Sequence, residues 1–195
     1  MTRQEKVLKI IERLRKVYPN AKIALQFENP YQLLIATILS AQATDVSVNL
    51  ATPELFRKYP KPENLAKAPV SEIDGFIKNI NFHKNKAKTI KAAAAMLVEK
   101  FHGQVPENMA DLDSLPGVAR KTANVVLGSA FGKAEGIVVD THMIRLSNKL
   151  GLTNSKDPVK IEKDLMEILP KSEWINFPLM LILHGRHFCT ARPHT

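Results

Sequence analysis

The stretch Leu115-Pro116-Gly117-Val118-Ala119-Arg120-Lys121-Thr122-Ala123 decides how this chain is interpreted. Proline disfavours a helical backbone at the residue before it, so Pro116 ends the preceding helix. Gly117 supplies either a positive φ or a close backbone approach. The next N–H groups then lie at the start of a helix, where exposed donors and the positive end of the helix dipole suit a phosphate oxygen. The stretch therefore predicts a tight hairpin that binds an anion, and an ordinary turn between two helices is an equally good interpretation.

A lysine after this hairpin and an aspartate farther along the chain form a candidate reactive pair. Lys121 lies in the first turn of the expected helix, and Asp140, in Val139-Asp140-Thr141-His142, lies where we expect another helix to begin. A neutral amine can attack an electrophilic carbon, and a carboxylate can accept or shuttle the proton. Plainer interpretations stay open: Lys121 contacts phosphate or solvent, and Asp140 caps the helix 141–150.

The composition favours a globular protein with a polyanionic partner. The 195 residues allow one large domain or two small ones, and the 45% hydrophobic content excludes wholesale disorder. Because 28 Lys and Arg face 19 Asp and Glu, the net charge is +9, which predicts salt-sensitive binding to a polyanion. The lone Cys189 excludes an internal disulfide framework. No apolar signal core opens the chain, and the apolar run 33–39 is too short to cross a bilayer, so we expect a soluble, cytoplasmic protein.

Apolar residues at helical spacing predict an all-α fold. The predicted helices cover residues 7–18, 30–39, 43–56, 86–101, 106–115, 119–131, 140–150, 159–169 and 174–186. The β-branched residues near Ile35 and Val46 would also suit strands, but they lack the alternation of period two that strands require. The run 136–139 suits either a strand or a buried connector, and we favour the connector.

One window of the sequence is strongly basic. Residues 77–91 include no acidic side chain, and their basic positions are Lys78, His83, Lys84, Lys86, Lys88 and Lys91. Spacings of four and three place Lys84, Lys88 and Lys91 on one face of a helix. A solvated helix face is the ordinary interpretation of such a run. The absence of compensating acids and the nearby hairpin favour a surface that follows phosphates.

Four blocks of the sequence together resemble the endonuclease III family, the helix-hairpin-helix group of DNA glycosylases. The resemblance runs from Pro30 to Cys189, and its blocks are Leu39–Asp45 (LSAQATD), the hairpin 115–127, Val139–His142 (VDTH) and Leu183–Arg186 (LHGR). It implies a two-lobed all-α fold with a deep cleft between the lobes. One lobe is a six-helix domain over 22–133 that contains the hairpin motif at 107–131. The second helical domain is formed by both chain ends, 1–21 plus 134–195.

The resemblance also implies an activity, which is excision of oxidised pyrimidines from duplex DNA followed by AP lyase cleavage. Lys121 would attack C1′ of the damaged nucleoside and form a Schiff base, and β-elimination would nick the strand 3′ to the lesion. Asp140 would assist proton transfer. We expect the remaining site residues to contact the DNA: Gln42, Phe82, His83, Leu115, Gly117, Val118, Ala119 and Arg120. Gln42 would fill the stack that the flipped base leaves, and Ser40 and Asp45 would line the base pocket or act as helix caps. We expect the partner to be lesion-bearing double-stranded DNA. We expect the protein to be a monomer that binds no membrane.

This chain departs from the family pattern in two DNA-contacting segments. The hairpin of the family reads Gly-Val-Gly, and Ala119 replaces the second glycine. We expect alanine to be harmless there, because the position falls at the start of a helix. Where the family commonly has Ile-Gly-Leu-Tyr, this chain has Ile80-Asn81-Phe82-His83. Asn81 tolerates the left-handed region, and Phe82 can stack or wedge as well as leucine.

A third departure concerns a cofactor. Family members usually carry a [4Fe–4S] cluster on four cysteines spaced C-x6-C-x2-C-x5-C. Cys189 matches the first ligand, residues 190–195 supply the six intervening positions, and the sequence ends there. This chain therefore cannot complete the cluster by itself. We expect either a fragment of a longer protein or a form that lives without the cluster, and we favour the fragment.

Two other functions share features with this sequence. The related adenine glycosylase that acts on mismatches lacks the lysine nucleophile and carries a catalytic glutamate near the Ser40-Ala41-Gln42 segment. The segment here has no glutamate and Lys121 is present, which argues against that enzyme. A DNA-binding protein with a helix-hairpin-helix and no catalysis, or an enzyme impaired by truncation, is the alternative that stays open.

Overall fold

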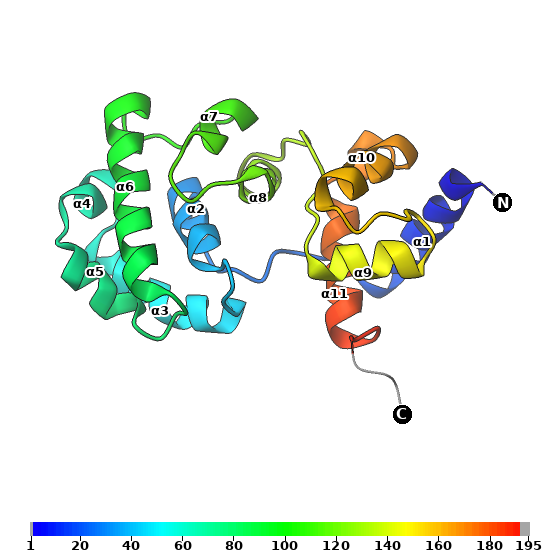
Figure 1. Cartoon of the computed structure of the whole chain (residues 1–195), viewed down its shortest axis with the longest axis horizontal. Helices are drawn as coiled ribbons and strands as arrows, with labels where there is room; N and C mark the ends of the chain where they lie inside the picture. The colour runs from blue at the N-terminus through cyan, green and yellow to red at the C-terminus, as the bar shows by residue number, and fades with distance from the viewer. Residues whose placement is uncertain (1, 192–195) are drawn as a thin grey trace. The chain divides into compact units, whose positions relative to one another are not determined.

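The structure is a computed structural model that describes residues 2–191. Over that range every regular element is a helix, which confirms the predicted all-α class. Contacts within the chain define two compact units (Figure 1). The described residues of unit 1 are 2–23 and 132–191, and unit 2 consists of residues 24–131. No helix in the described part of the chain is long and apolar enough to cross a membrane.

Unit 2 is built around α2 (Pro30–Leu39), in which nine of the ten residues are buried. Asn29 caps this helix by accepting a hydrogen bond from the Gln32 N–H at 3.0 Å, and Pro30 occupies the first helical position. A helix that is apolar on every side belongs inside a core. Three helices surround it, α3 (Asp45–Lys58), α6 (His83–Phe101) and α8 (Arg120–Phe131).

Three shorter helices complete unit 2, and the sequence did not predict two of them. These are α4 (Pro62–Lys67) and α5 (Val70–Ile77), which pack against α6 as Figure 1 shows. The third, α7 (Met109–Asp113), was expected to begin at Pro106. It begins later because the Asn108 side chain accepts a hydrogen bond from the Asp111 N–H at 2.9 Å and so caps the helix there.

Unit 1 combines the first helix of the chain with the last ones. It contains α1 (Arg3–Val17), α9 (Thr141–Lys149), α10 (Pro158–Ile168), the 3-10 helix η1 (Lys171–Glu173) and α11 (Asn176–His187). The buried face of α1 carries Val7, Ile11 and Leu14, and α1 packs against α10 and α11. Phe177 of α11 is fully buried in the same core.

The connector that leads into α9 forms neither helix nor strand, as predicted for residues 136–139. Ile137 and Val139 are buried, and the Ile137 N–H donates to Glu162 Oε1 at 3.2 Å. A side chain thus satisfies a buried backbone donor where no neighbouring strand does so. This anchoring fixes the residues that directly precede Asp140.

Candidate active site

The hairpin before α8 requires glycine at position 117 for two reasons. Gly117 has a φ of +77°, which is the left-handed region. A Cβ atom there would also lie 2.4 Å from Thr89 Cγ2 of α6 and 3.1 Å from Ile38 Cγ2 of α2. The exposed hairpin is therefore pressed against the two helices that carry the other predicted contact loops.

Two residues of the hairpin that were expected to contact a ligand have buried side chains. Leu115 and Val118 are 2% and 7% exposed and belong to the core of unit 2. The Val118 N–H already donates to the Leu115 carbonyl oxygen at 3.1 Å. Any contact that these two residues make with a ligand therefore uses other backbone atoms, and the two side chains anchor the hairpin.

Ala119 lies directly before α8 and is not among the residues with positive φ in the described chain. Its carbonyl oxygen accepts the Ala123 N–H at 3.0 Å, the first hydrogen bond of the helix. Alanine in place of the usual glycine is therefore compatible with the backbone, as expected. The N–H groups of the first turn precede that bond and point out of the helix start.

Lys121 is exposed in this first turn, beside the exposed Arg120. The opposite face of α8 carries the buried Ala123, Val126 and Leu127, and the helix packs against α2. Burial of that face fixes how α8 is rotated. An amine is thereby held at a helix N-terminus beside an exposed glycine turn, where it can reach an anionic ligand.

Asp140 belongs to unit 1 and is the N-cap of α9. Its Oδ1 accepts the Met143 N–H at 2.8 Å, so the capping role that the sequence left open is present. The cap uses one carboxylate oxygen, and the side chain is half-exposed. Capping fixes the orientation of the carboxylate and is compatible with a second role in proton transfer.

The loop after α2 places Gln42 in an unusual backbone conformation. Gln42 has a φ of 53° and is exposed. Ser40, at the C-terminal cap of α2, donates its hydroxyl to the Thr37 carbonyl oxygen at 2.8 Å. The N-cap of α3 is Thr44, and Asp45 is the first residue of that helix. Of the two proposed pocket residues, Ser40 thus serves as a cap, and Asp45 begins a helix that Thr44 caps.

The second loop differs from expectation at residues 81 and 82. The residue in the left-handed region is Phe82, with a φ of 59°, and not Asn81. Phe82 is also 62% exposed, which is unusual for a large aromatic side chain. His83 begins α6, and its Nδ1 lies 2.5 Å from Asp74 Oδ1 of α5. The Asn81 side chain instead donates to the Gln42 carbonyl oxygen at 3.0 Å.

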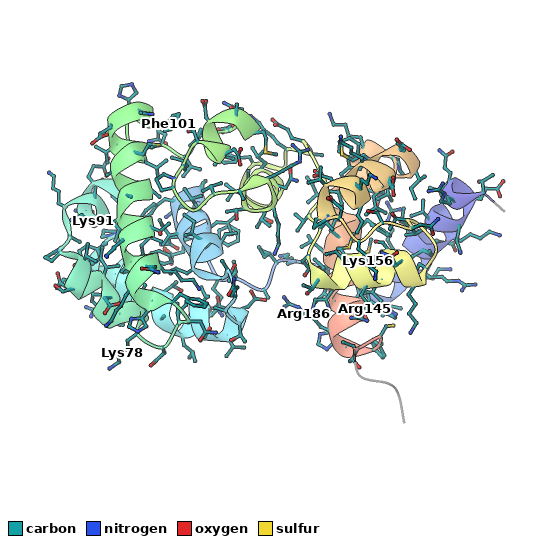
Figure 2. The ribbon with its side chains drawn as sticks, in the orientation of Figure 1. Lys78, Lys91, Phe101, Arg145, Lys156 and Arg186 are labelled. Atoms are coloured by element: carbon teal, nitrogen blue, oxygen red, sulfur yellow. The ribbon has the colours of Figure 1, made fainter. Side chains whose placement is uncertain are left out.

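The basic window divides into a surface group and one buried lysine. Lys78, Lys84 and Lys88 are exposed and Lys91 is half-exposed (Lys78 and Lys91 are labelled in Figure 2). Lys86 is only 8% exposed, so its place in the predicted phosphate surface is wrong. Its ammonium donates to the Leu39 carbonyl oxygen at 2.8 Å and to the Ala41 carbonyl oxygen at 2.6 Å. Burial lowers the pKa of Lys86.

The residues near Cys189 do not form a metal centre. The sequence contains one cysteine, and a [4Fe–4S] cluster held by four thiolates therefore does not fit these 195 residues. Among residues 2–191, no group of three or more His, Cys, Asp and Glu side chains is placed to hold a metal ion. Lys149 Nζ lies 3.4 Å from the Cys189 sulfur, and Arg145 donates to the Cys189 carbonyl oxygen at 2.5 Å. Arg145, labelled in Figure 2, belongs to α9, which packs against α11.

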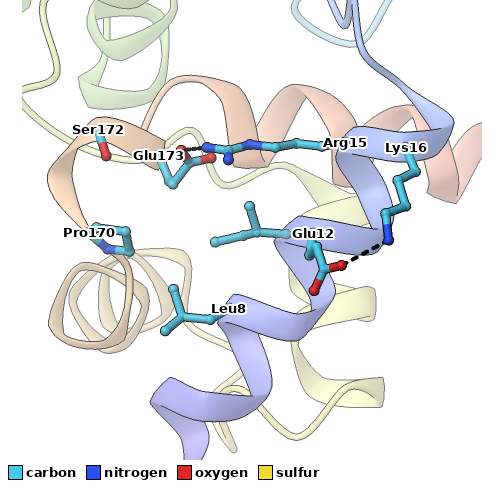
Figure 3. Close-up of a pocket in the computed structure, with 8 residues that line it drawn as sticks. Leu8, Glu12, Arg15, Lys16, Pro170, Ser172 and Glu173 are labelled. Atoms are coloured by element: carbon cyan, nitrogen blue, oxygen red, sulfur yellow. Dashed lines mark hydrogen bonds and ion pairs between the residues drawn. The ribbon is translucent and has the colours of Figure 1, made fainter.

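A cavity of about 530 Å³ in unit 1 contains none of the predicted site residues. It lies between α1 and η1 (Figure 3) and is lined by Leu8, Ile11, Glu12, Arg15, Lys16, Pro170, Ser172 and Glu173. Glu173 is buried and pairs with Arg15, and Lys16 pairs with Glu12 at 2.8 Å. The first pair joins α1 to η1 and the second lies within α1, so we infer that both contribute to the stability of unit 1.

Residues 35–171 match the HhH-GPD superfamily base excision DNA repair protein family. The chain is 49% identical over 191 residues to the endonuclease III of Synechocystis sp., with 98% of this chain and 87% of the relative covered. It is 42% identical over 187 residues to the endonuclease III of Escherichia coli K12, covering 96% and 88%.

Solved structures give the same result. The fold is similar to that of a non-covalent endonuclease III–DNA complex, with a TM-score of 0.93 and 41% identity over 99% of this chain and 90% of the other. A trapped endonuclease III–DNA covalent intermediate matches with the same values. A thermostable thymine-DNA glycosylase matches with a TM-score of 0.84 and 25% identity over 96% of this chain and 89% of the other.

Proposed function

The chain belongs to the HhH-GPD superfamily of base excision DNA repair proteins, and from that membership we propose its activity. We infer that it removes oxidised pyrimidines from duplex DNA and then cuts the strand at the resulting abasic site. The observation that carries this proposal is the exposed Lys121 in the first turn of α8, directly after the Gly117 hairpin. Relatives that are named endonuclease III and align with nearly the whole chain support the proposal.

The hairpin and the basic face of α6 are suited to the DNA backbone. N–H groups at the start of α8 and the exposed Arg120 can bind a phosphate without reading the bases. Lys84 and Lys88 are exposed on α6, the helix against which the hairpin is pressed. We propose that they extend the phosphate contacts along the strand, which would make the affinity depend strongly on salt.

Gln42 and Phe82 are suited to the gap that a flipped base leaves. Extrusion of a base costs about a few kcal/mol, and the cost is smaller for a damaged base. Both residues are exposed and extend from loops held in left-handed conformations. A polar amide can pair with the orphaned base, and an aromatic ring can stack beside it.

The proposed chemistry begins with the Lys121 amine in its neutral form. Its nitrogen attacks C1′, the bond from C1′ to the base breaks, and the base leaves with a proton. The sugar ring opens to give a Schiff base between C1′ and Nζ. Loss of a C2′ proton then expels the 3′ phosphate, and water releases the lysine from the product. Asp140 would relay protons in these steps and would stabilise positive charge that develops on the sugar.

Borohydride trapping tests the proposal, because the reductant converts the Schiff base to a stable amine. We expect a covalent adduct on a duplex that contains one abasic site, and base release from a duplex that contains thymine glycol. Lys121→Ala should abolish both the adduct and the base release. Lys100→Ala removes an exposed lysine from the last turn of α6 and serves as the matched control, which should keep both. Salt-sensitive binding without an adduct would instead identify a DNA-binding protein without catalysis.

A further inference from the structure

Two loops of unit 2 are connected through one side chain. The Asn81 Nδ2 donates to the backbone carbonyl oxygen of Gln42 at 3.0 Å. Gln42 and Phe82, the residue after Asn81, both have positive φ values, at 53° and 59°. Residues other than glycine seldom adopt this backbone conformation unless their surroundings impose it. The hydrogen bond therefore joins the two loops that carry these exposed, conformationally restricted residues.

A buried lysine restricts the first of these loops from the other side. The Lys86 ammonium donates to the Leu39 carbonyl oxygen, at the last residue of α2, and to the Ala41 carbonyl oxygen, directly before Gln42. The last turn of α2 has no basic residue of its own, and a cation is favourable at the negative end of a helix dipole. Burial of an ammonium is costly unless hydrogen bonds compensate for it. The two hydrogen bonds of Lys86 therefore compensate for the burial of its ammonium group, a cost that an exposed lysine does not have.

We propose that Lys86 and Asn81 are positioning residues for the excision reaction. Lys86 sets the path of the chain through Leu39 and Ala41, and Asn81 fixes the Gln42 carbonyl. Gln42 and Phe82 are thereby preformed as a pair that enters the DNA stack together. The inference rests on the proposed function, because it assigns the pair to base flipping. Lys86 is buried and acts through Gln42, without contact with the sugar or the base.

The Asn81 contact also distinguishes this chain from the pattern that it resembles. A glycine at this position would leave the Gln42 carbonyl without the amide donor. The left-handed residue is Phe82, so Asn81 is not needed for its backbone conformation. Its amide is exposed and fixed by one hydrogen bond, which makes the contact simple to remove without disturbing the core.

If Asn81 and Lys86 are positioning residues, their replacement should impair base flipping more than the chemical steps. A base analogue such as 2-aminopurine placed opposite an abasic site reports on insertion into the stack, because its fluorescence depends on stacking. We expect Asn81→Asp to reduce the fluorescence change on binding and to slow base release from thymine glycol about tenfold or more. Borohydride trapping on an abasic site, which has no base to extrude, should fall less. Asn79→Asp adds the same charge to a neighbouring exposed position and is the matched control.

Variants of Lys86 test the second contact. Lys86→Met keeps an unbranched side chain as far as Cε and removes the ammonium that donates both hydrogen bonds, and it should show the same pattern as Asn81→Asp. Lys86→Arg restores charge and donors and should recover part of the fluorescence change. Thermal melting of each variant identifies loss of folding, and the surface substitution Asn81→Asp still decides the question if Lys86→Met does not fold.

Two results would overturn the inference. One is an unchanged 2-aminopurine signal in Asn81→Asp, and the other is an equal loss of trapping and base release in folded variants. Absence of an adduct with the unmodified chain would contradict the proposed lyase instead. The fluorescence comparison requires binding alone, so it would still test the positioning role in that case. Failure of the unmodified chain to bind the duplex would overturn both proposals.

Discussion

Gly117 lies so close to Thr89 that a Cβ atom on the glycine would be 2.4 Å from Thr89 Cγ2. Gly117→Ala must therefore shift the Thr89 side chain or the hairpin, in addition to holding alanine at a φ of +77°. The left-handed backbone alone costs about 1–2 kcal/mol. Gly132→Ala is the matched control, because Gly132 has a φ of +65° and nothing within 4 Å of its Cβ position. We expect Gly117→Ala to lower the free energy of unfolding in urea by about 1 kcal/mol more than the control does. Equal losses would show that the contact with Thr89 is unimportant.

Asp140→Asn separates the cap from the proposed chemistry. Asparagine caps helices as well as aspartate does, so its oxygen can still accept the Met143 N–H and the stability of α9 should change little. Proton transfer is lost, and we expect single-turnover base release to slow by about 10²-fold or more. DNA affinity, measured by anisotropy, should change far less than the rate. A similar loss in both measurements would count against a chemical role for Asp140.

The salt dependence of DNA binding tests the surface of α6. Replacement of both Lys84 and Lys88 by alanine should lower the slope of log K against log salt by about two, because each phosphate contact contributes nearly one. The matched control replaces Lys9 and Lys100, which are also exposed and carry the same charge. Lys86→Met should leave the slope unchanged, since Lys86 is buried. A change of slope in Lys86→Met would contradict its assignment to the interior.

Two neighbouring ion pairs of α1 should contribute differently to the stability of the protein. Arg15 pairs with Glu173, whose side chain is 5% exposed, whereas Lys16 and Glu12 are both largely exposed. Removal of Arg15 leaves a buried carboxylate without its ion-pair partner, although its own 60% exposure moderates the loss. We expect Arg15→Ala to cost about 1–2 kcal/mol and Lys16→Ala less than about 0.5 kcal/mol in thermal unfolding. A smaller effect for Arg15→Ala than for Lys16→Ala would show that this pair is not structural.

The buried hydroxyl of Tyr31 should make the protein less stable in alkaline solution. Burial raises the pKa of the Tyr31 hydroxyl above its ordinary value of 10, and that hydroxyl donates to the Tyr59 carbonyl oxygen at 3.2 Å. Above pH 10 the unfolded chain releases this proton while the folded chain retains it, so rising pH favours unfolding. Tyr31→Phe should flatten the decline in the free energy of unfolding between about pH 9.5 and 11. An unchanged decline would assign the alkaline sensitivity to other groups.

The sequence predicted most of the long helices but missed two short ones, and neither the burial of Lys86 nor the left-handed backbone of Phe82 was expected. The bounds of α2 agree with expectation because Asn29 and Pro30 mark its start and its apolar run ends at Leu39. The helices α4 and α5 were missed because six and eight residues are too few for a clear apolar period. Short elements of this kind are fixed by packing, here against α6.

Lys86 shows what a charge run conceals. Its charge grouped it with Lys84 and Lys88, but it shares a helix face with the buried Ile90, Ala93 and Leu97. The helical spacing of those apolar residues was visible in the sequence and would have placed Lys86 inside. No such signal in the sequence indicated that Phe82, and not Asn81, has the left-handed backbone. The Asn81 side chain donates to the Gln42 carbonyl oxygen, which is contributed by a loop distant in sequence.

The composition of the two units sets the order in which the enzyme can be assembled. Unit 2 is one continuous segment, whereas α1 is synthesised before it and packs against α10 and α11, which are synthesised after it. Domains generally fold as units during synthesis. Unit 2, with Lys121, can therefore fold on a nascent chain whose unit 1, with Asp140, still lacks α10 and α11. Partly synthesised chains would carry the proposed nucleophile before the unit of its proposed partner is complete, so activity would be delayed until unit 1 has folded.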